Sequence, residues 1–256
     1  MPKLNALVAG STGYIGVQLI KLLIKHKYIN IKYLCGNSSV GKNISNYDKS
    51  LNGKKLDKYQ IISCPGCYPT SVLLPLIPLL KNNLVKVKNI IIDSKSGYSG
   101  AGRGVHKKYK DKNLYESLSA YGVGFHRHNS EIDQMLKKFT KKELSFNFTP
   151  HLTPMFRGIL STIYVDLENG VTQSKAIKTL KSFYKKSDFV KILRKDSLIS
   201  TNDVINSNNC FISICKSKYK DKIIILSAID NLIKGGAGQA VQNLNMKFNF
   251  PVKTAL

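Results

Sequence analysis

The sequence is short of tryptophan, arginine and acidic residues. Across 256 residues it has no Trp, and 15 Asp and Glu stand against 40 Lys and Arg, so the formal net charge is +25. Arginine occurs only at positions 103, 127, 157 and 194. Arginine, the residue that makes forked contacts to phosphates and bases, is thus scarce. The lysines are scattered along the chain and do not form a basic tract. We therefore expect a basic, solvated surface and no nucleic-acid partner.

Long apolar runs and a regular set of cysteines are also missing. No stretch reaches the ~18 apolar residues of a membrane-spanning helix, so no membrane partner is expected. The first residues lead directly into a glycine turn without a basic segment or an apolar segment in front of it, so we expect no secretory signal. The five cysteines form a sparse, odd set, which is typical of a reducing compartment. The predicted location is the cytoplasm.

The chain has enough apolar residues to bury a core, with 43% of the sequence hydrophobic. Residues 4–9, 14–27 and 31–34 predict a strand, a helix and a strand. Loops are expected at 36–59 and 94–104. Further strands are predicted at 61–63, 87–93, 145–148, 160–166, 210–214 and 223–228, and further helices at 70–80, 131–139, 175–184 and 235–248. This second part predicts an α+β domain with a mainly antiparallel sheet.

A glycine-rich turn joins the first predicted strand to the first predicted helix. The candidate cofactor-binding residues in it are Gly10, Ser11, Thr12, Gly13, Tyr14, Ile15 and Gly16. Glycine lets the backbone approach a pyrophosphate and the helix N-terminus offers free N–H groups, so the turn predicts a dinucleotide site. Ser38, rather than an acidic residue, follows the second strand, which favours NADP over NAD. A tight packing turn and an ordinary polar loop are the alternative interpretations.

Cys67 follows Pro65 and Gly66 and precedes an apolar helix. A thiol at a helix N-terminus has its thiolate favoured by the helix dipole and by free amides, which suits a nucleophile in acyl transfer. The nearby amides could also stabilise an oxyanion. Two alternatives stay open: a buried, inert cysteine, or a redox pair with Cys64. A zinc site is not expected, because no second ligand pair with suitable spacing follows.

His126, Arg127, His128 and Glu131 gather just before a predicted helix. Histidine is the natural proton carrier near neutral pH. In an extended segment His126 and His128 would project to the same side, and Glu131 could orient one of them. The alternative interpretation is a surface cluster without a catalytic role.

Together these motifs resemble the N-acetyl-gamma-glutamyl-phosphate reductase family. Residues 64–70 resemble the family's Asn-Pro-Gly-Cys-Tyr-Pro-Thr, and residues 126–132 resemble its His-Arg-His-x-Pro-Glu-Ile. Residues 93–103 resemble its substrate loop, and residues 149–158 and 230–240 resemble two further blocks. The order of these blocks along the chain makes the resemblance specific.

The resemblance implies an NADP(H)-dependent reduction of N-acetyl-glutamyl phosphate to the semialdehyde, a step of arginine biosynthesis. It implies that Cys67 is the nucleophile and His126 the general base, with His128 and Glu131 in support. Arg103 and Arg157 are the candidates for holding the acidic substrate, since a guanidinium suits carboxylate and phosphate. The family association also implies a homo-oligomer.

The implied fold is a Rossmann-type NAD(P)-binding domain, α/β in class, with a glyceraldehyde-3-phosphate-dehydrogenase-like α+β catalytic domain. Only 50 residues lie between Gly16 and Cys67, which is too few for a complete doubly wound domain. We therefore expect a shortened nucleotide-binding domain at residues 1–66, completed by a C-terminal helix at about 235–256. Residues 67–234 are the expected catalytic and dimerisation domain.

Two departures from the family pattern lie close to the predicted site. Cys64 replaces the family's asparagine and Ser130 its proline. Together with the shortened first domain, they leave two alternatives to the reductase. One is a weak or inactive remnant that acts as a subunit or interaction protein. The other is an enzyme similar to aspartate-semialdehyde dehydrogenase.

Overall fold

The computed structural model describes residues 3–9, 14–35, 62–102, 116–140 and 143–256. These residues divide between two compact units. The smaller unit comprises Met1–Cys64 and Gly236–Leu256, and the larger unit comprises Pro65–Gly235. The loop expected at 36–59 lies outside the described residues.

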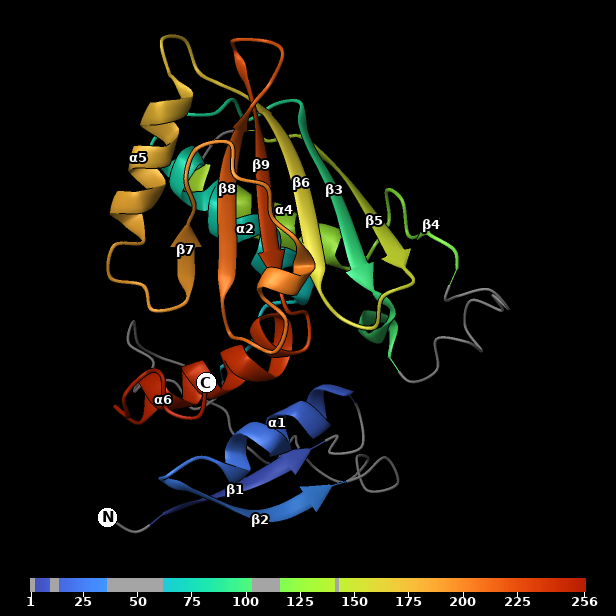
Figure 1. Ribbon diagram of the computed structural model, residues 1–256, viewed down its shortest axis with the longest axis vertical. Helices are drawn as coiled ribbons and strands as arrows, with labels where there is room; N and C mark the ends of the chain where they lie inside the picture. Colours follow the sequence, from blue (N-terminus) through green and yellow to red (C-terminus); the bar gives the residue numbers. More distant parts are fainter. Residues whose placement is uncertain (1–2, 10–13, 36–61, 103–115, 141–142) are drawn as a thin grey trace. The chain divides into compact units, whose positions relative to one another are not determined.

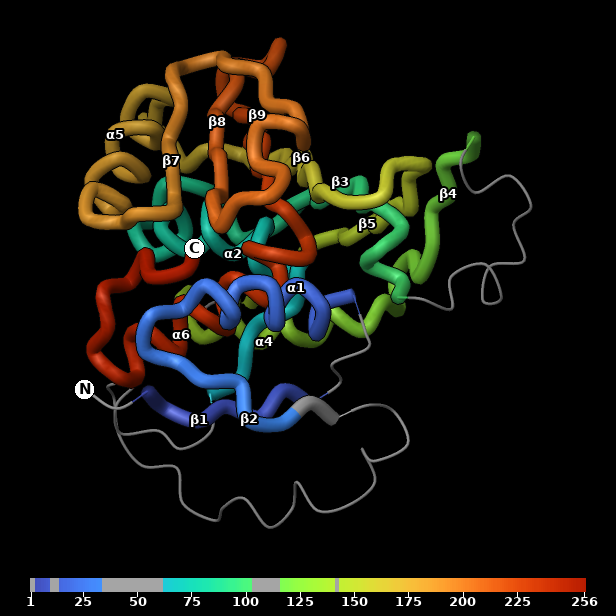
Figure 2. Tube along the Cα trace, turned by 60° about the horizontal axis from the view of Figure 1, so that its bottom comes forward, coloured from blue at the N-terminus to red at the C-terminus, as the bar shows by residue number. Residues whose placement is uncertain are grey.

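The smaller unit is built on a strand–helix–strand crossover (Figure 2). Strand β1 (Leu4–Ala9) leads to helix α1 (Tyr14–Ile24) and then to β2 (Ile29–Cys35), which pairs with β1 in parallel. Helix α6 (Gly238–Lys247) adds Val241 to a core that contains Val8, Leu23 and Ile29. The predicted crossover is therefore confirmed.

Helix α1 ends earlier than its apolar pattern predicts. The N–H groups of Lys25 and His26 turn back to the carbonyls of Leu22 and Leu23, at 3.1 and 3.0 Å. The His26 imidazole then accepts the N–H of Tyr28 at 3.2 Å, which closes the turn into β2. A side chain that bonds to the backbone competes with helix continuation, and it does so here.

The larger unit contains a seven-stranded sheet with the order β4-β5-β3-β6-β9-β8-β7 (Figure 1). Its strands are β3 (Ile90–Gly97), β4 (Ser119–Ala120), β5 (Phe146–Thr153), β6 (Ile159–Asp166), β7 (Val190–Ile192), β8 (Cys210–Lys216) and β9 (Lys222–Ile229). The pairs β3–β5 and β7–β8 are parallel, and the other neighbours are antiparallel. The prediction of a mainly antiparallel sheet is confirmed.

Helices α2 (Cys67–Lys81), α4 (His128–Thr140) and α5 (Gln173–Phe183) complete the larger unit. In Figure 1, α2 and α4 lie behind the sheet. Their apolar side chains form one core with the strands, which includes Leu76, Ile132, Leu180, Ile163 and Ile225. This packing fixes the start of α2 over the sheet.

Buried hydroxyl groups also hold α2 on the sheet. Ser161 on β6 bonds to Ser71 of α2 and to Ser94 of β3, both at 2.7 Å between Oγ atoms. The Ser71 hydroxyl also donates to the carbonyl of Tyr68 at 2.9 Å. Because all these serines are fully buried, each needs the others as partners.

Some predicted elements were wrong. Residues 62 and 63 are not in a strand, and residues 94–97 continue β3 instead of forming a loop. The loop interpretation failed because buried serines look polar in the sequence, whereas here their hydroxyls are paired within the sheet. No helix in the described parts of the chain is long and apolar enough to cross a membrane.

Candidate active site

Cys67 is the first residue of α2, which begins three residues before the predicted start of this helix at residue 70. Gly66 precedes it as the N-cap with an extended backbone (φ −63°, ψ 162°), and its carbonyl accepts the N–H of Thr70 at 2.9 Å. The Cys67 side chain is half-buried. The thiol therefore lies at the end of the helix where backbone N–H groups have no partner within the helix.

Two glycines allow close packing around Cys67. A Cβ atom on Gly66 would lie 2.5 Å from Nε2 of His128. A Cβ atom on Gly235 would lie 2.6 Å from Cβ of Cys67. Real contacts of this kind are essentially never so short. Glycine at both positions is therefore what lets the His128 imidazole approach Gly66 and the backbone at Gly235 approach Cys67.

Burial raises the pKa of the Cys67 thiol to about 11. The backbone N–H groups of Tyr68 and Cys67 and the charge of Arg127 lower this pKa, but by less. The backbone N–H groups at the helix terminus thus favour the thiolate, but desolvation outweighs them. A reaction at Cys67 near neutral pH needs a base that takes the proton.

The two histidines come together through a turn, not through an extended segment. His128 begins α4, and its backbone N–H donates to Nδ1 of His126 at 3.1 Å. The ring centroids are 4.8 Å apart at an interplanar angle of 72°. Because Nδ1 of His126 accepts a hydrogen bond, a neutral His126 carries its proton on Nε2.

His128 is the imidazole that packs on the N-cap of α2. Burial, with smaller contributions from the nearby charges of His126 and Arg127, lowers the pKa of His128 to about 4. Its Nδ1 is buried without a hydrogen-bond partner among the described residues. His128 is therefore neutral at pH 7 and can accept a proton.

Glu131 holds the backbone next to Cys67. Its Oε1 accepts the N–H of Gly66 at 3.0 Å. This contact joins α4 to the N-cap of α2 across 65 positions of sequence. The carboxylate also raises the pKa of Cys67 slightly, as expected for a neighbouring negative charge.

A cavity of about 390 Å³ opens beside His126. It is lined by Gly100, Ala101, Tyr121, Gly122, Phe125, His126 and Arg127. The hydroxyl of Tyr121 lies 3.0 Å from that of Tyr68, the residue after Cys67, and the His126 ring packs edge-on against both tyrosine rings. The sequence patterns did not point to Tyr121, and they placed Arg127 in the histidine cluster without giving it a role.

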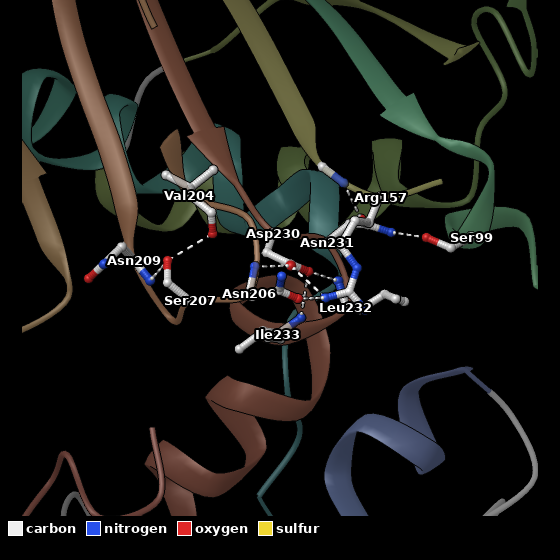
Figure 3. Close-up of polar contacts among 11 residues, drawn as sticks. Ser99, Arg157, Val204, Asn206, Ser207, Asn209, Asp230, Asn231, Leu232 and Ile233 are labelled. Carbon is white, nitrogen blue, oxygen red and sulfur yellow. Dashed lines mark hydrogen bonds and ion pairs between the residues drawn. The ribbon is translucent and has the colours of Figure 1, made fainter. Parts of the chain in front are cut away.

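Arg157, a predicted substrate residue, is part of a buried polar cluster (Figure 3). Its Nη1 lies 3.1 Å from Oδ2 of Asp230, and the Asp230 side chain is fully buried. The same carboxylate accepts the N–H groups of Asn206, Leu232 and Ile233 at 2.8–3.1 Å. The pair thus fixes the segment that leads to Gly235.

The remaining predicted residues lie in the smaller unit or outside the described parts. Tyr14, Ile15 and Gly16 form the first turn of α1, and Gly16 is buried there. Gly10, Ser11, Thr12, Gly13, Ser38 and Arg103 lie outside the described residues. In the parts of the chain that the structure describes, no three His, Cys, Asp or Glu residues form a cluster able to hold a metal ion.

Two family models match the chain. The description "Semialdehyde dehydrogenase, dimerisation domain" matches residues 67–231, and "Semialdehyde dehydrogenase, NAD binding domain" matches residues 5–64. The structure is similar to that of aspartate semialdehyde dehydrogenase II from Vibrio cholerae, with a TM-score of 0.70 and 13% identity. That likeness covers 97% of this chain and 99% of the other, and at this identity it speaks for the fold alone.

Curated relatives carry the name N-acetyl-gamma-glutamyl-phosphate reductase. The Desulforamulus reducens protein is 50% identical over 196 residues, which cover 77% of this chain and 57% of that protein. A probable chloroplastic enzyme of Arabidopsis thaliana is 46% identical over 205 residues, or 78% of this chain and 50% of that protein. This chain thus spans about half the length of these relatives.

The Ehrlichia canis relative aligns over almost its whole length. It is 33% identical over 339 residues, which cover 99% of this chain and 97% of that protein. Since this chain has 256 residues, the alignment leaves part of the relative without a counterpart, in keeping with the short match to the NAD-binding model. The chain therefore belongs to the N-acetyl-gamma-glutamyl-phosphate reductase family of semialdehyde dehydrogenases.

Proposed function

We propose that this protein reduces N-acetyl-gamma-glutamyl phosphate to the semialdehyde with NADPH, through a thioester on Cys67, as a step of arginine biosynthesis. One observation carries the proposal. Cys67 begins α2, where Gly66 precedes it in the chain and Gly235 packs against its Cβ atom. The neutral imidazole of His128 packs on Gly66. Family membership supplies the substrate.

His128 supports the proposed first step better than His126 does. Nδ1 of His126 already accepts a hydrogen bond, whereas Nδ1 of His128 is unpartnered among the described residues. His128 takes the thiol proton as sulfur attacks the acyl carbon. The C–S bond forms, the C–O bond to phosphate breaks, and the phosphate leaves with that electron pair.

The resting thiol makes this step costly without substrate. With a thiol pKa of about 11 and a His128 pKa of about 4, transfer of the proton from Cys67 to His128 is unfavourable by about 10 kcal/mol in the resting chain. A bound acyl phosphate brings negative charge close to His128, which raises the pKa of that imidazole and makes it a stronger base. Free N–H groups at the start of α2 can stabilise the oxyanion that develops on the acyl oxygen.

The smaller unit fits a nicotinamide dinucleotide in part. Its parallel crossover places the first turn of α1 just beyond the end of β1, and buried Gly16 allows close packing of helix and strand. The cofactor would supply the hydride that reduces the thioester. The predicted turn from Gly10 to Gly16 would hold its pyrophosphate, and Ser38 is the proposed site of the 2′-phosphate that distinguishes NADP.

A homo-oligomer is part of the proposal. Ile91 on β3 and Tyr164 on β6 are directly opposite each other, and both are exposed, at 47% and 43%. An apolar cross-strand pair left open on a sheet face suits contact with a second copy. The match of this unit to a dimerisation domain supports the same interpretation.

The shortened nucleotide-binding part favours one alternative, in which the protein is a remnant without reductase activity. Its match to the NAD-binding model covers only residues 5–64. NADPH oxidation with N-acetyl-gamma-glutamyl phosphate separates the two functions, with the reverse reaction as a second assay. We expect turnover that Cys67→Ser abolishes and Cys64→Ser preserves. A folded protein with neither turnover nor NADPH binding would favour the remnant, and full activity of Cys67→Ser would contradict the mechanism.

A further inference from the structure

The guanidinium groups of Arg127 and Arg157 differ in whether a carboxylate of the described residues pairs with them. Arg157 already forms an ion pair with the fully buried carboxylate of Asp230. No carboxylate among the described residues forms an ion pair with Arg127, although the structure records such pairs elsewhere in the same unit. Oε1 of Glu131, four residues further along the chain, accepts the N–H of Gly66. Within the described parts of the chain, Arg127 is therefore a cation without a fixed counter-charge.

The position of Arg127 directs this charge at the site. The residue lines the 390 Å³ cavity together with His126, and it is exposed to solvent there. Its charge also reaches both reacting groups, since it lowers the pKa of the Cys67 thiol and of the His128 imidazole. A cavity of this size holds a small metabolite, and a convergent charged group in it fixes the ligand's orientation.

We propose that Arg127 forms the phosphate subsite of the Cys67 site and holds the phosphoryl group of the acyl phosphate while the thiol attacks. The identity of the substrate depends on the proposed function, whereas anion binding at this subsite can be measured without turnover. A guanidinium binds a phosphate through two parallel hydrogen bonds. This places the leaving group beside the nucleophile and stabilises it as the C–O bond breaks.

The subsite can be tested without cofactor or substrate. Cys67 is alkylated in a Cys64→Ser background with anionic iodoacetate and, separately, with neutral iodoacetamide, and the product is measured by peptide mass spectrometry. Arg127→Gln should lower the ratio of the iodoacetate rate to the iodoacetamide rate about tenfold, because the attraction of the anion is lost. Inorganic phosphate should protect Cys67 from iodoacetate saturably in the parent protein and not in Arg127→Gln.

Arg194→Gln is the matched control, because Arg194 is an exposed arginine of the same unit and lines none of this cavity. It should leave the alkylation ratio unchanged. Arg127→Lys, which keeps the charge and loses the fork, should retain most of the ratio. An unchanged ratio in Arg127→Gln, or an equal fall in Arg194→Gln, would overturn the subsite.

Measurements of reductase turnover then distinguish a failure of the phosphate subsite from a failure of the proposed function. In an active enzyme Arg127→Gln should raise KM for the acyl phosphate, with partial rescue by Arg127→Lys. A protein that shows the alkylation effects and has no reductase activity would keep the phosphate subsite and refute the reductase. A reductase whose KM for the acyl phosphate is unaffected by Arg127→Gln would refute the subsite alone.

Discussion

Replacing Gly66 by alanine tests the packing of His128 on the nucleophile's helix. The added Cβ would lie 2.5 Å from Nε2 of His128, whereas ordinary contacts begin at 3.4 Å. The backbone of Gly66 is in the extended region, so alanine brings no backbone strain. The imidazole must therefore move by about 1 Å, at an overpacking cost of about 1–3 kcal/mol in the free energy of unfolding.

A double-mutant cycle isolates this contact. In a His128→Ala background the ring is gone, so Gly66→Ala should cost less than about 0.5 kcal/mol or stabilise slightly through the unfolded state. Urea unfolding followed by circular dichroism measures both values. An equal cost of Gly66→Ala in the two backgrounds would show that His128 does not pack on Gly66. In an active enzyme, a displacement of this size should lower kcat about 100-fold.

Three further results are expected. Gly235→Ala should displace Cys67, because the new Cβ would lie 2.6 Å from its Cβ, and the alkylation rate of Cys67 should change while the rate at Cys215 does not; equal changes at both would contradict this. The iodoacetamide rate at Cys67 should rise with pH towards its pKa of about 11, and a plateau below pH 8 would show a preformed thiolate. Asp230→Asn should lower the free energy of unfolding by about 3–5 kcal/mol, because it leaves the guanidinium of Arg157 buried without its charge partner, and a urea-measured loss below about 1 kcal/mol would refute the buried pair.

Local patterns in the sequence predicted the elements that depend on neighbouring residues. The apolar run before Gly10 and the helical spacing after it give the parallel crossover of β1, α1 and β2. The apolar spacing of residues 70–80 predicts α2, although the helix begins three residues earlier, at Cys67. The family resemblance, drawn from ordered motifs, is confirmed by the matching family models and relatives.

Features that depend on burial or distant contacts could not be predicted in this way. The raised pKa of Cys67 follows from desolvation, which no local pattern reports. The bond from Gly66 to Glu131 and the ion pair of Arg157 with Asp230 join residues 65 and 73 positions apart. Strands β4 and β7 have only two and three residues, too few for a visible alternation.

The most direct test of the central claim is to trap the acyl group on Cys67. The protein is mixed with N-acetyl-gamma-glutamyl phosphate without NADPH, and the peptides are examined by mass spectrometry while released phosphate is counted. We expect one N-acetylglutamyl group on the peptide that contains Cys67, with one equivalent of phosphate released, and neither in Cys67→Ser. A folded protein that releases no phosphate and stays unmodified, or that carries the acyl group at another residue, would contradict it.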